Sequence, residues 1–180
     1  MSWPRIARLA AVFALAGLTA GCFQPLYGDH SPGGPALIDK LAGVEVAPID
    51  APNGSRIARV GVEVRDQLIY QLTGGTYAPT PAYRLTINLS PIQQQVIVDV
   101  TSARPEIQNY GIDATYTLTD ITTGKSVITG RTFSRVSFDA PGQEQRFAAA
   151  RGQRDAEDRA AKVIAENIRS RLTSFFVTGS

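Results

Sequence analysis

Two parts of the chain carry hydrophobic residues at a spacing of three or four, which is typical of a helix with one apolar face. In residues 53–75 that face consists of Ile57, Val60, Val64, Leu68 and Leu72. Asn53 or Ser55 can cap the start of this helix. Gly74 or Gly75 can end it in the left-handed conformation. The pattern therefore predicts an amphipathic helix between these caps.

Residues 154–176 show the same spacing and predict a second amphipathic helix near the C-terminus. Its apolar face consists of Ala156, Ala160, Ile164, Ile168, Leu172 and Phe175. Asp155, Glu157 and Asp158 stand at its start, where the helix dipole favours acidic residues. We interpret Glu157 and Asp158 as part of a helix start and not as a general acid and base. Residues 140–153 are predicted to form a long connection before this helix.

Between the two helices the hydrophobic period changes to two, which indicates strands with one buried and one solvent-facing side. Three strands are predicted here: the first covers residues 82–90 and resumes at 93–100, and the others cover 109–120 and 126–138. A short strand at 43–49 precedes the first helix. Pro91 is expected to bend the chain, which then resumes its extended pattern, and Gly124 lies in a predicted hairpin turn.

The last of these strands has no single apolar side. Val127 and Phe133 fall on one side of it. Val136 and Phe138 fall on the other, which indicates a bulge or an edge strand. Together the elements predict an α+β two-layer sandwich in the order β-α-β-β-β-α. We expect the two helices to pack on one face of a four-stranded, mostly antiparallel sheet.

The N-terminus has the pattern of a secretory signal peptide. Residues 1–21 combine two arginines, an apolar run of ten residues and a small-residue exit. A membrane-spanning helix needs about 20 apolar residues, so this run is too short to be one. Residues 22–36 are rich in proline and glycine and are predicted to form a flexible tether. Residues 37–180 are predicted to form a single domain.

The segment from Leu18 to Cys22 resembles the lipobox of bacterial lipoproteins, in which the cysteine is acylated and becomes the new amino terminus. The chain departs from the usual pattern at Thr19, where leucine is common. The resemblance implies that Cys22 anchors the protein to a membrane through acyl chains. The alternative is an ordinary secreted protein whose single cysteine is a free thiol. Phe23 stands where an aspartate would retain the protein at the inner membrane, which favours the outer membrane.

Composition excludes one class of partner. The 180 residues include 18 lysines and arginines and 16 aspartates and glutamates, and two of the arginines leave with the signal peptide. The mature chain is then neutral overall, which argues against nucleic acid, because such binding depends on neutralising phosphates.

Catalytic chemistry is not indicated. The single histidine, His30, lies in the tether without an acid or thiol beside it, and no zinc-protease, nucleophile-elbow or phosphate-loop motif occurs. No serine has a recognisable activating partner. The sequence therefore predicts no enzyme, no cofactor and no metal site.

Basic residues on the predicted sheet have two interpretations. Arg104, Lys125, Arg131 and Arg135 come from its loops and strands. They are either solvated charges that discourage aggregation at a sheet edge or contacts to the anionic headgroup of a lipid.

Several stretches resemble the LPS-assembly lipoprotein family (LptE). They are the mature start at residues 22–28 and the segments 59–72, 116–125 and 154–172. The chain departs from the family pattern in two places: the glycine that usually follows the cysteine is missing, and the segment after the last strand differs. The resemblance covers nearly the whole mature chain.

The resemblance implies a function that composition does not show. Members of the family sit inside the lumen of LptD, the β-barrel of the LPS translocon. There they help the barrel to assemble and take part in LPS insertion at the outer membrane. For this chain the expected partners are LptD, LPS and the membrane, and the expected headgroup contacts are Arg104, Lys125 and Arg131. The alternative is an auxiliary lipoprotein of a phospholipid or ABC-type envelope transport system.

Overall fold

The computed structural model describes residues 37–74, 80–99, 104–139 and 146–179, and Cys22, the tether and His30 lie outside these ranges. The described elements are α2 (Leu37–Ala42), β1 (Val44–Val46), α3 (Arg56–Thr73), β2 (Tyr83–Asp99), β3 (Arg104–Asp120), β4 (Ser126–Asp139) and α4 (Arg146–Thr178).

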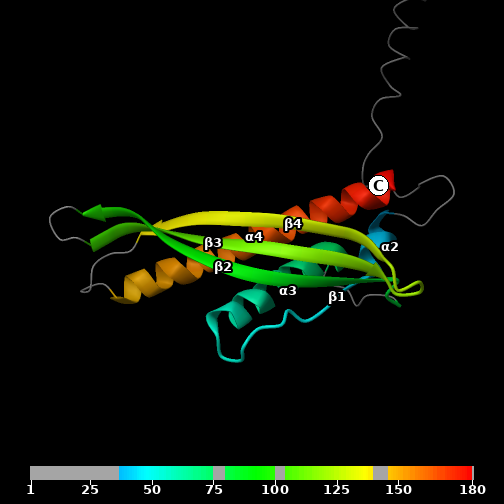
Figure 1. Ribbon diagram of the computed structural model, residues 1–180, viewed down its shortest axis with the longest axis horizontal. Coiled ribbons are helices and arrows are strands. Elements are labelled where there is room, and N and C mark those ends of the chain that lie inside the picture. The colour runs from blue at the N-terminus through cyan, green and yellow to red at the C-terminus, as the bar shows by residue number, and fades with distance from the viewer. Residues whose placement is uncertain (1–36, 75–79, 100–103, 140–145, 180) are drawn as a thin grey trace, which may run out of the picture. The chain divides into compact units, whose positions relative to one another are not determined.

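The four strands form one sheet in the order β1-β2-β3-β4. β1 runs parallel to β2, and the other two pairs are antiparallel. The α+β two-layer prediction is confirmed, since the described helices lie behind the sheet and leave its other face uncovered by any described element (Figure 1). α2 is an addition to the two predicted helices, because six residues are too few for a helical period to show in the sequence.

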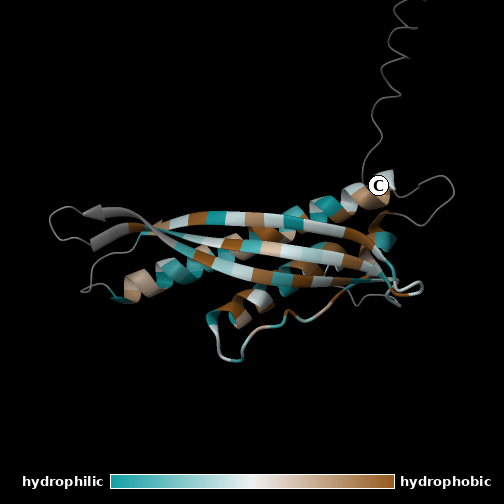
Figure 2. Ribbon diagram, in the orientation of Figure 1, coloured by the Kyte–Doolittle hydropathy of each residue, from teal (hydrophilic) through white to brown (hydrophobic). Residues whose placement is uncertain are grey.

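The apolar sides predicted for β2 and β3 form the core. Along these strands the hydropathy changes from residue to residue (Figure 2). The largest fully buried side chains of the two strands are Leu85, Ile87, Tyr110, Ile112 and Leu118. Opposite them lie the predicted stripes of α3 and α4, of which only the end members Ile57 and Phe175 are half-buried instead of buried. Alanines on the inner side of α4 allow it to lie close to its neighbours.

The caps of α3 resolve the alternatives left by the sequence. The Ser55 hydroxyl accepts a hydrogen bond from the Ala58 amide at 3.2 Å, so Ser55 is the N-cap. Gly74 ends the helix with φ 67°, and its N–H donates to the Tyr70 carbonyl. This conformation strains residues with a side chain, which explains the glycine.

Pro91 does not bend the chain, so that prediction is wrong. β2 continues through it, and Pro91 pairs with Ile112 in an unbroken register. The Leu85 carbonyl accepts a hydrogen bond from the Ala47 amide, on the side of β2 away from β3. Every second residue of β2 counted from Leu85 therefore directs its backbone N–H and C=O away from β3. Pro91 is one of these residues, so its missing N–H removes no hydrogen bond between β2 and β3.

β4 is both an edge strand and bulged, as its mixed pattern indicated. The register shifts between Leu118 and Thr119, which leaves Val127 as the extra residue. Val136 and Phe138 then face the helices, whereas Phe133 lies on the uncovered face.

α4 begins earlier than the sequence predicts. It starts at Arg146, so most of the predicted connection at 140–153 is helical. Gly152 lies inside this extension, and a Cβ there would stand 3.3 Å from the Asp139 carbonyl oxygen. The glycine thus permits a close approach between α4 and the end of β4. As a result Glu157 and Asp158 lie within α4 and not at its start, which corrects their interpretation.

Candidate functional site

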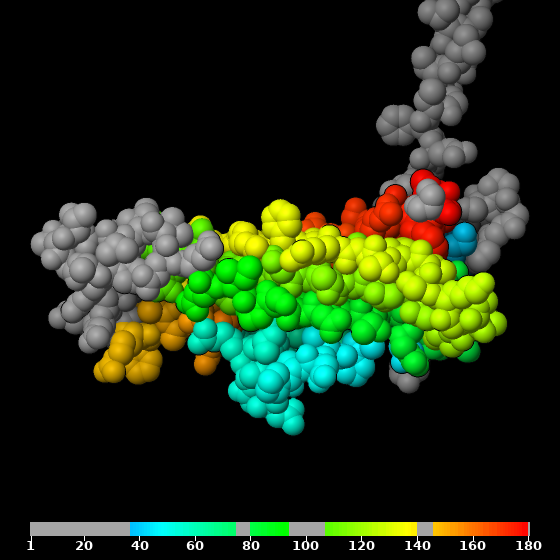
Figure 3. Space-filling view, in the orientation of Figure 1, coloured from blue at the N-terminus to red at the C-terminus, as the bar shows by residue number. Residues whose placement is uncertain are grey.

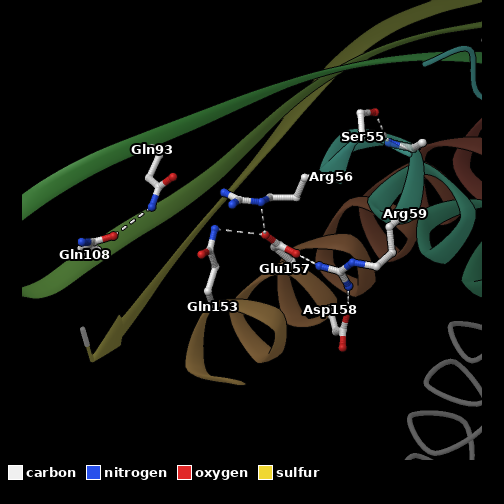
Figure 4. A network of polar contacts seen from close by, with 9 residues as sticks. Ser55, Arg56, Arg59, Gln93, Gln108, Gln153, Glu157 and Asp158 are labelled. Atoms are coloured by element: carbon white, nitrogen blue, oxygen red, sulfur yellow. Dashed lines mark hydrogen bonds and ion pairs between the residues drawn. The ribbon is translucent and has the colours of Figure 1, made fainter. Parts of the chain in front are cut away.

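The first polar cluster joins the beginning of α3 to α4 and consists of Arg56, Arg59, Gln153, Glu157 and Asp158, which we call the Glu157 cluster (Figure 4). Arg56 Nε lies 3.5 Å from Glu157 Oε1, and Arg59 Nη2 pairs with Glu157 Oε2. Arg59 Nη1 also reaches Asp158 Oδ1 at 3.4 Å. Gln153 Nε2 donates to Glu157 Oε1 at 3.3 Å.

Because Glu157 is buried, its carboxylate would be destabilising without its arginine partners. The Glu157 side chain is 1% exposed, whereas those of Arg56 and Arg59 are 57% and 43% exposed. Removing a carboxylate from water costs several kcal/mol unless opposite charges and hydrogen bonds compensate. The two guanidinium groups supply this compensation and tie α3 to α4.

Two grooves flank Arg56. The first, of about 700 Å³, lies between α3 and α4, and its charged lining residues are Arg56, Arg59, Arg154 and Glu157. Arg154 has no hydrogen bond or ion pair among the described residues. With Asp158 included, three arginines face two carboxylates, so the surroundings of this groove carry one excess positive charge.

The second groove, of about 480 Å³, lies between the start of α3 and strands β2 and β3, and we call it the α3–β2 groove. Ser55, Arg56 and Ile57 line it from the helix, and Pro91, Ile92 and Gln93 line it from β2.

Tyr110 of β3 completes the lining of the α3–β2 groove. Tyr110 is 2% exposed, and its buried hydroxyl has no hydrogen-bond partner among the described residues. Burial raises the pKa of Tyr110, and the positive charges of Arg56 and Arg59 act on that pKa in the opposite direction.

A second cluster lies on the uncovered face of the sheet, which the space-filling view turns toward the viewer (Figure 3). Arg135 Nη2 donates to Asp113 Oδ1 at 2.7 Å, and Arg131 Nη2 lies 3.5 Å from Asp113 Oδ2. The guanidinium carbon of Arg135 stands 5.5 Å from the centre of the Phe133 ring, and Phe133 is 66% exposed. We call these four residues the open-face cluster.

Gly111 explains the position of Arg135. The two residues are paired across β3 and β4, and a Cβ on Gly111 would come within 2.7 Å of the Arg135 side chain. The arginine therefore lies flat across the glycine, where its Nη1 also donates to the carbonyls of Ile112 and Ser134. Aromatic residues and arginines are enriched at the energetically important positions of protein–protein interfaces. The open-face cluster combines an exposed aromatic ring with arginines that are fixed by hydrogen bonds.

The basic residues named from the sequence are not gathered at one place. Arg131 belongs to the open-face cluster. Lys125 is exposed at the turn between β3 and β4. Arg104 is the first residue of β3, at the other end of that strand, and its side chain lies outside the described part of the structure. A strand of this length spans roughly 50 Å, so Arg104 and Lys125 cannot contact one headgroup together.

Among the described residues, no group of histidine, cysteine, aspartate and glutamate is placed to hold a metal ion. In the same part of the chain, no helix has the length and apolar character needed to cross a membrane. The described clusters are suited to binding anions through arginines.

Comparison with known families decides the relationship. The model of the LptE family, described as lipopolysaccharide-assembly, matches residues 41–172, which is more than half of the chain. The chain belongs to this family. The LptE family consists of assembly lipoproteins and not of enzymes, and membership gives the protein a role in assembling LPS at the cell envelope. No curated protein matches the chain in sequence.

Solved structures share the fold of this LptE family member. A protein from Caulobacter crescentus CB15 described as a lipoprotein has a TM-score of 0.63 and 21% identity, over 80% of this chain and 97% of its own. Rare lipoprotein B from Shewanella oneidensis has a TM-score of 0.53 and 12% identity, over 74% and 96%. A minor lipoprotein from Acinetobacter baumannii has a TM-score of 0.51 and 12% identity, over 74% and 92%.

Sequence reasoning missed the Glu157 cluster, although a signal was present. Glu157 precedes Ala161 by four residues and Ile164 by seven, so it belongs to the buried side of α4. A charged residue at such a position requires a partner from another element, and the arginines of α3 provide it.

Proposed function

We propose that this LptE family member is an outer-membrane lipoprotein that occupies the lumen of the LptD barrel. There it assists assembly of the barrel and takes part in LPS insertion. In this proposal residues 1–21 are removed as a signal peptide, and acyl chains on Cys22 hold the protein in the membrane. Residues 22–36 act as the tether, and residues 37–180 form the domain inside the barrel.

Family membership over residues 41–172 carries the proposal, and the uncovered sheet face supports it. The helices cover only one side of the sheet, so the other side remains available to a partner. That side is mainly polar, with threonines such as Thr115 and Thr129 exposed around the open-face cluster. A polar surface with one exposed aromatic ring suits contact with a water-lined barrel wall.

For LPS itself we propose Arg104, Lys125 and Arg131 as contacts to headgroup phosphates, because arginine and lysine form charge-assisted hydrogen bonds with them. Arg104 and Lys125 stand near opposite ends of β3, so each would contact a different headgroup or act at a different stage of LPS insertion. Their effects on binding should therefore be nearly additive.

The test substitutes Arg104→Ser and Lys125→Ser, singly and together, and measures LPS binding by the purified protein. The double variant should bind LPS more weakly, with an unchanged thermal unfolding curve and normal recovery of the barrel. Lys162→Ser, at an exposed position on α4, serves as the control and should bind normally. Unchanged LPS binding in the double variant would return both residues to the role of solvated edge charges.

The assembly role has a separate test in cells. Depletion of the protein should lower the amount of folded LptD in the outer membrane, and newly made LPS should fail to reach the cell surface. Normal barrel levels and normal surface LPS after depletion would contradict the proposed function.

A further inference from the structure

We propose that the α3–β2 groove binds the phosphate group of an anionic amphiphile, with Arg56, Tyr110 and the N-terminus of α3 as its ligands. The choice of a lipid rests on the proposed function, whereas the site is argued from α3, β2 and β3. This site is separate from Arg104, Lys125 and Arg131.

The start of α3 offers unused hydrogen-bond donors. The Ser55 hydroxyl satisfies the Ala58 amide. The amides of Arg56 and Ile57 have no intrahelical partner, because the first N–H groups of a helix lack one. Together with the positive end of the helix dipole, such donors favour an oxyanion.

Tyr110 is the second, independent observation. A hydroxyl buried without a partner is destabilising, because it has lost its hydrogen bonds to water. Tyr110 lines the groove that also contains Ser55 and Arg56. The hydroxyl itself has almost no exposed surface, so the ring must turn toward the groove before a phosphate oxygen at the helix N-terminus can accept the hydrogen bond that the hydroxyl lacks.

Arg56 provides the charge. Its Nε pairs with Glu157 at 3.5 Å, while Arg59 makes the closer pair with that carboxylate. No partner of the Arg56 Nη atoms lies among the described residues, and the side chain is exposed between the two grooves. Arg56 can therefore turn to a phosphate while Arg59 continues to neutralise Glu157.

The remaining lining of the groove explains why the ligand is an amphiphile. Ile57, Pro91 and Ile92 present apolar groups beside Arg56. An inorganic phosphate would leave these groups in water, whereas the first carbons of an acyl or glyceride chain would cover them. Gln93, which is held by a 2.8 Å hydrogen bond to Gln108, lines the same groove and offers a polar contact to an ester group.

The experiment is calorimetric titration of the full mature chain in detergent with dihexanoyl phosphatidic acid. Dihexanoyl phosphatidylcholine and inorganic phosphate are titrated in parallel. Phosphatidic acid should bind measurably more tightly than either of the other two. Equal binding of phosphatidylcholine would show apolar partitioning only, and equal binding of inorganic phosphate would show a simple anion site. Either result would overturn the proposal.

Two variants test the ligands. Tyr110→Phe should weaken phosphatidic acid binding about tenfold, while its thermal unfolding midpoint stays the same or rises because an unpaired buried hydroxyl is gone. Arg56→Gln should weaken binding at least as much. Tyr116→Phe, a buried tyrosine of the same strand outside the groove, is the matched control and should bind normally.

Other outcomes refute the site. If Tyr110→Phe raises stability without affecting binding, the hydroxyl is merely unsatisfied and the proposal is wrong. If Arg56→Gln no longer co-purifies with the barrel but binds lipid normally, the groove binds an acidic segment of a protein and the proposal is wrong. Because the titration contains neither LptD nor LPS, its failure is distinguishable from a failure of the proposed function.

Discussion

Replacing Glu157 with glutamine tests the role of the Glu157 cluster in stability. The substitution keeps the size of the side chain and one hydrogen-bond acceptor but removes the negative charge. In the native protein that charge faces Arg59 and Arg56, and Gln153 donates to the same carboxylate. We expect Glu157→Gln to destabilise the domain, because both arginines lose their counter-charge.

The expected loss is about 2 kcal/mol. A hydrogen bond to a charged group contributes about 1.5–3 kcal/mol. Breaking a fully buried pair costs more, about 3–5 kcal/mol. The arginines are about half exposed and can turn to water, so the smaller range applies. For a domain of this size the loss corresponds to a fall in Tm of roughly 5–10 °C.

The assay is urea and thermal unfolding of the full chain, followed by circular dichroism. Asp158→Asn is the matched control, since Asp158 pairs with the same Arg59 but is half exposed, and its loss should cost at most about 1 kcal/mol. A double-mutant cycle of Arg59→Gln with Glu157→Gln isolates the pair and should give a coupling of about 1–3 kcal/mol.

Two results would refute this reasoning. One is a Glu157→Gln protein as stable as Asp158→Asn, which would mean that burial of the carboxylate does not strengthen its ion pairs. The other is a coupling energy near zero, which would mean that Arg59 and Glu157 do not interact in solution.

Three further predictions concern other parts of the chain. Gly130→Ala should destabilise by about 1–3 kcal/mol in thermal unfolding, because the new Cβ meets the buried Tyr116 ring, and adding Tyr116→Leu should recover part of the loss. Burial raises the pKa of Tyr110 and Tyr116, so the unfolded chain releases their protons first and the free energy of unfolding should fall as pH rises above about 10. Urea titrations should show a smaller fall in the tyrosine-to-phenylalanine variants, and an equal fall would contradict the assignment. Mass spectrometry of the membrane-extracted protein should show a chain that begins at Cys22 with added lipid mass, and an unmodified start elsewhere would disprove the anchor.

Local patterns predicted most of the core. The helical spacing of α3 and the alternation along β2 and β3 each depend on residues a few positions apart, which the sequence displays directly. The start of α4 was misjudged because Gly152 weakens a helical pattern. Only the neighbouring end of β4 explains why a glycine is favourable there.

The polar clusters depend on contacts between distant segments. Glu157 meets arginines about 100 positions away in the chain, and Tyr110 meets the N-terminus of α3 only after the sheet has formed. The opposite error concerns Arg104 and Lys125. Their shared positive charge suggested one binding site, although the length of β3 separates them. Such pairings follow from tertiary packing, which periodicity in a single sequence does not specify.

Co-purification tests the central claim most directly. The full lipoprotein, carrying an affinity tag at its C-terminus, is extracted from cells in mild detergent and its partners are identified by mass spectrometry. The proposed function predicts recovery of LptD, a large outer-membrane barrel, in a one-to-one ratio. Recovery of an inner-membrane transporter complex without the barrel would contradict it and would favour an auxiliary lipoprotein of an envelope transport system.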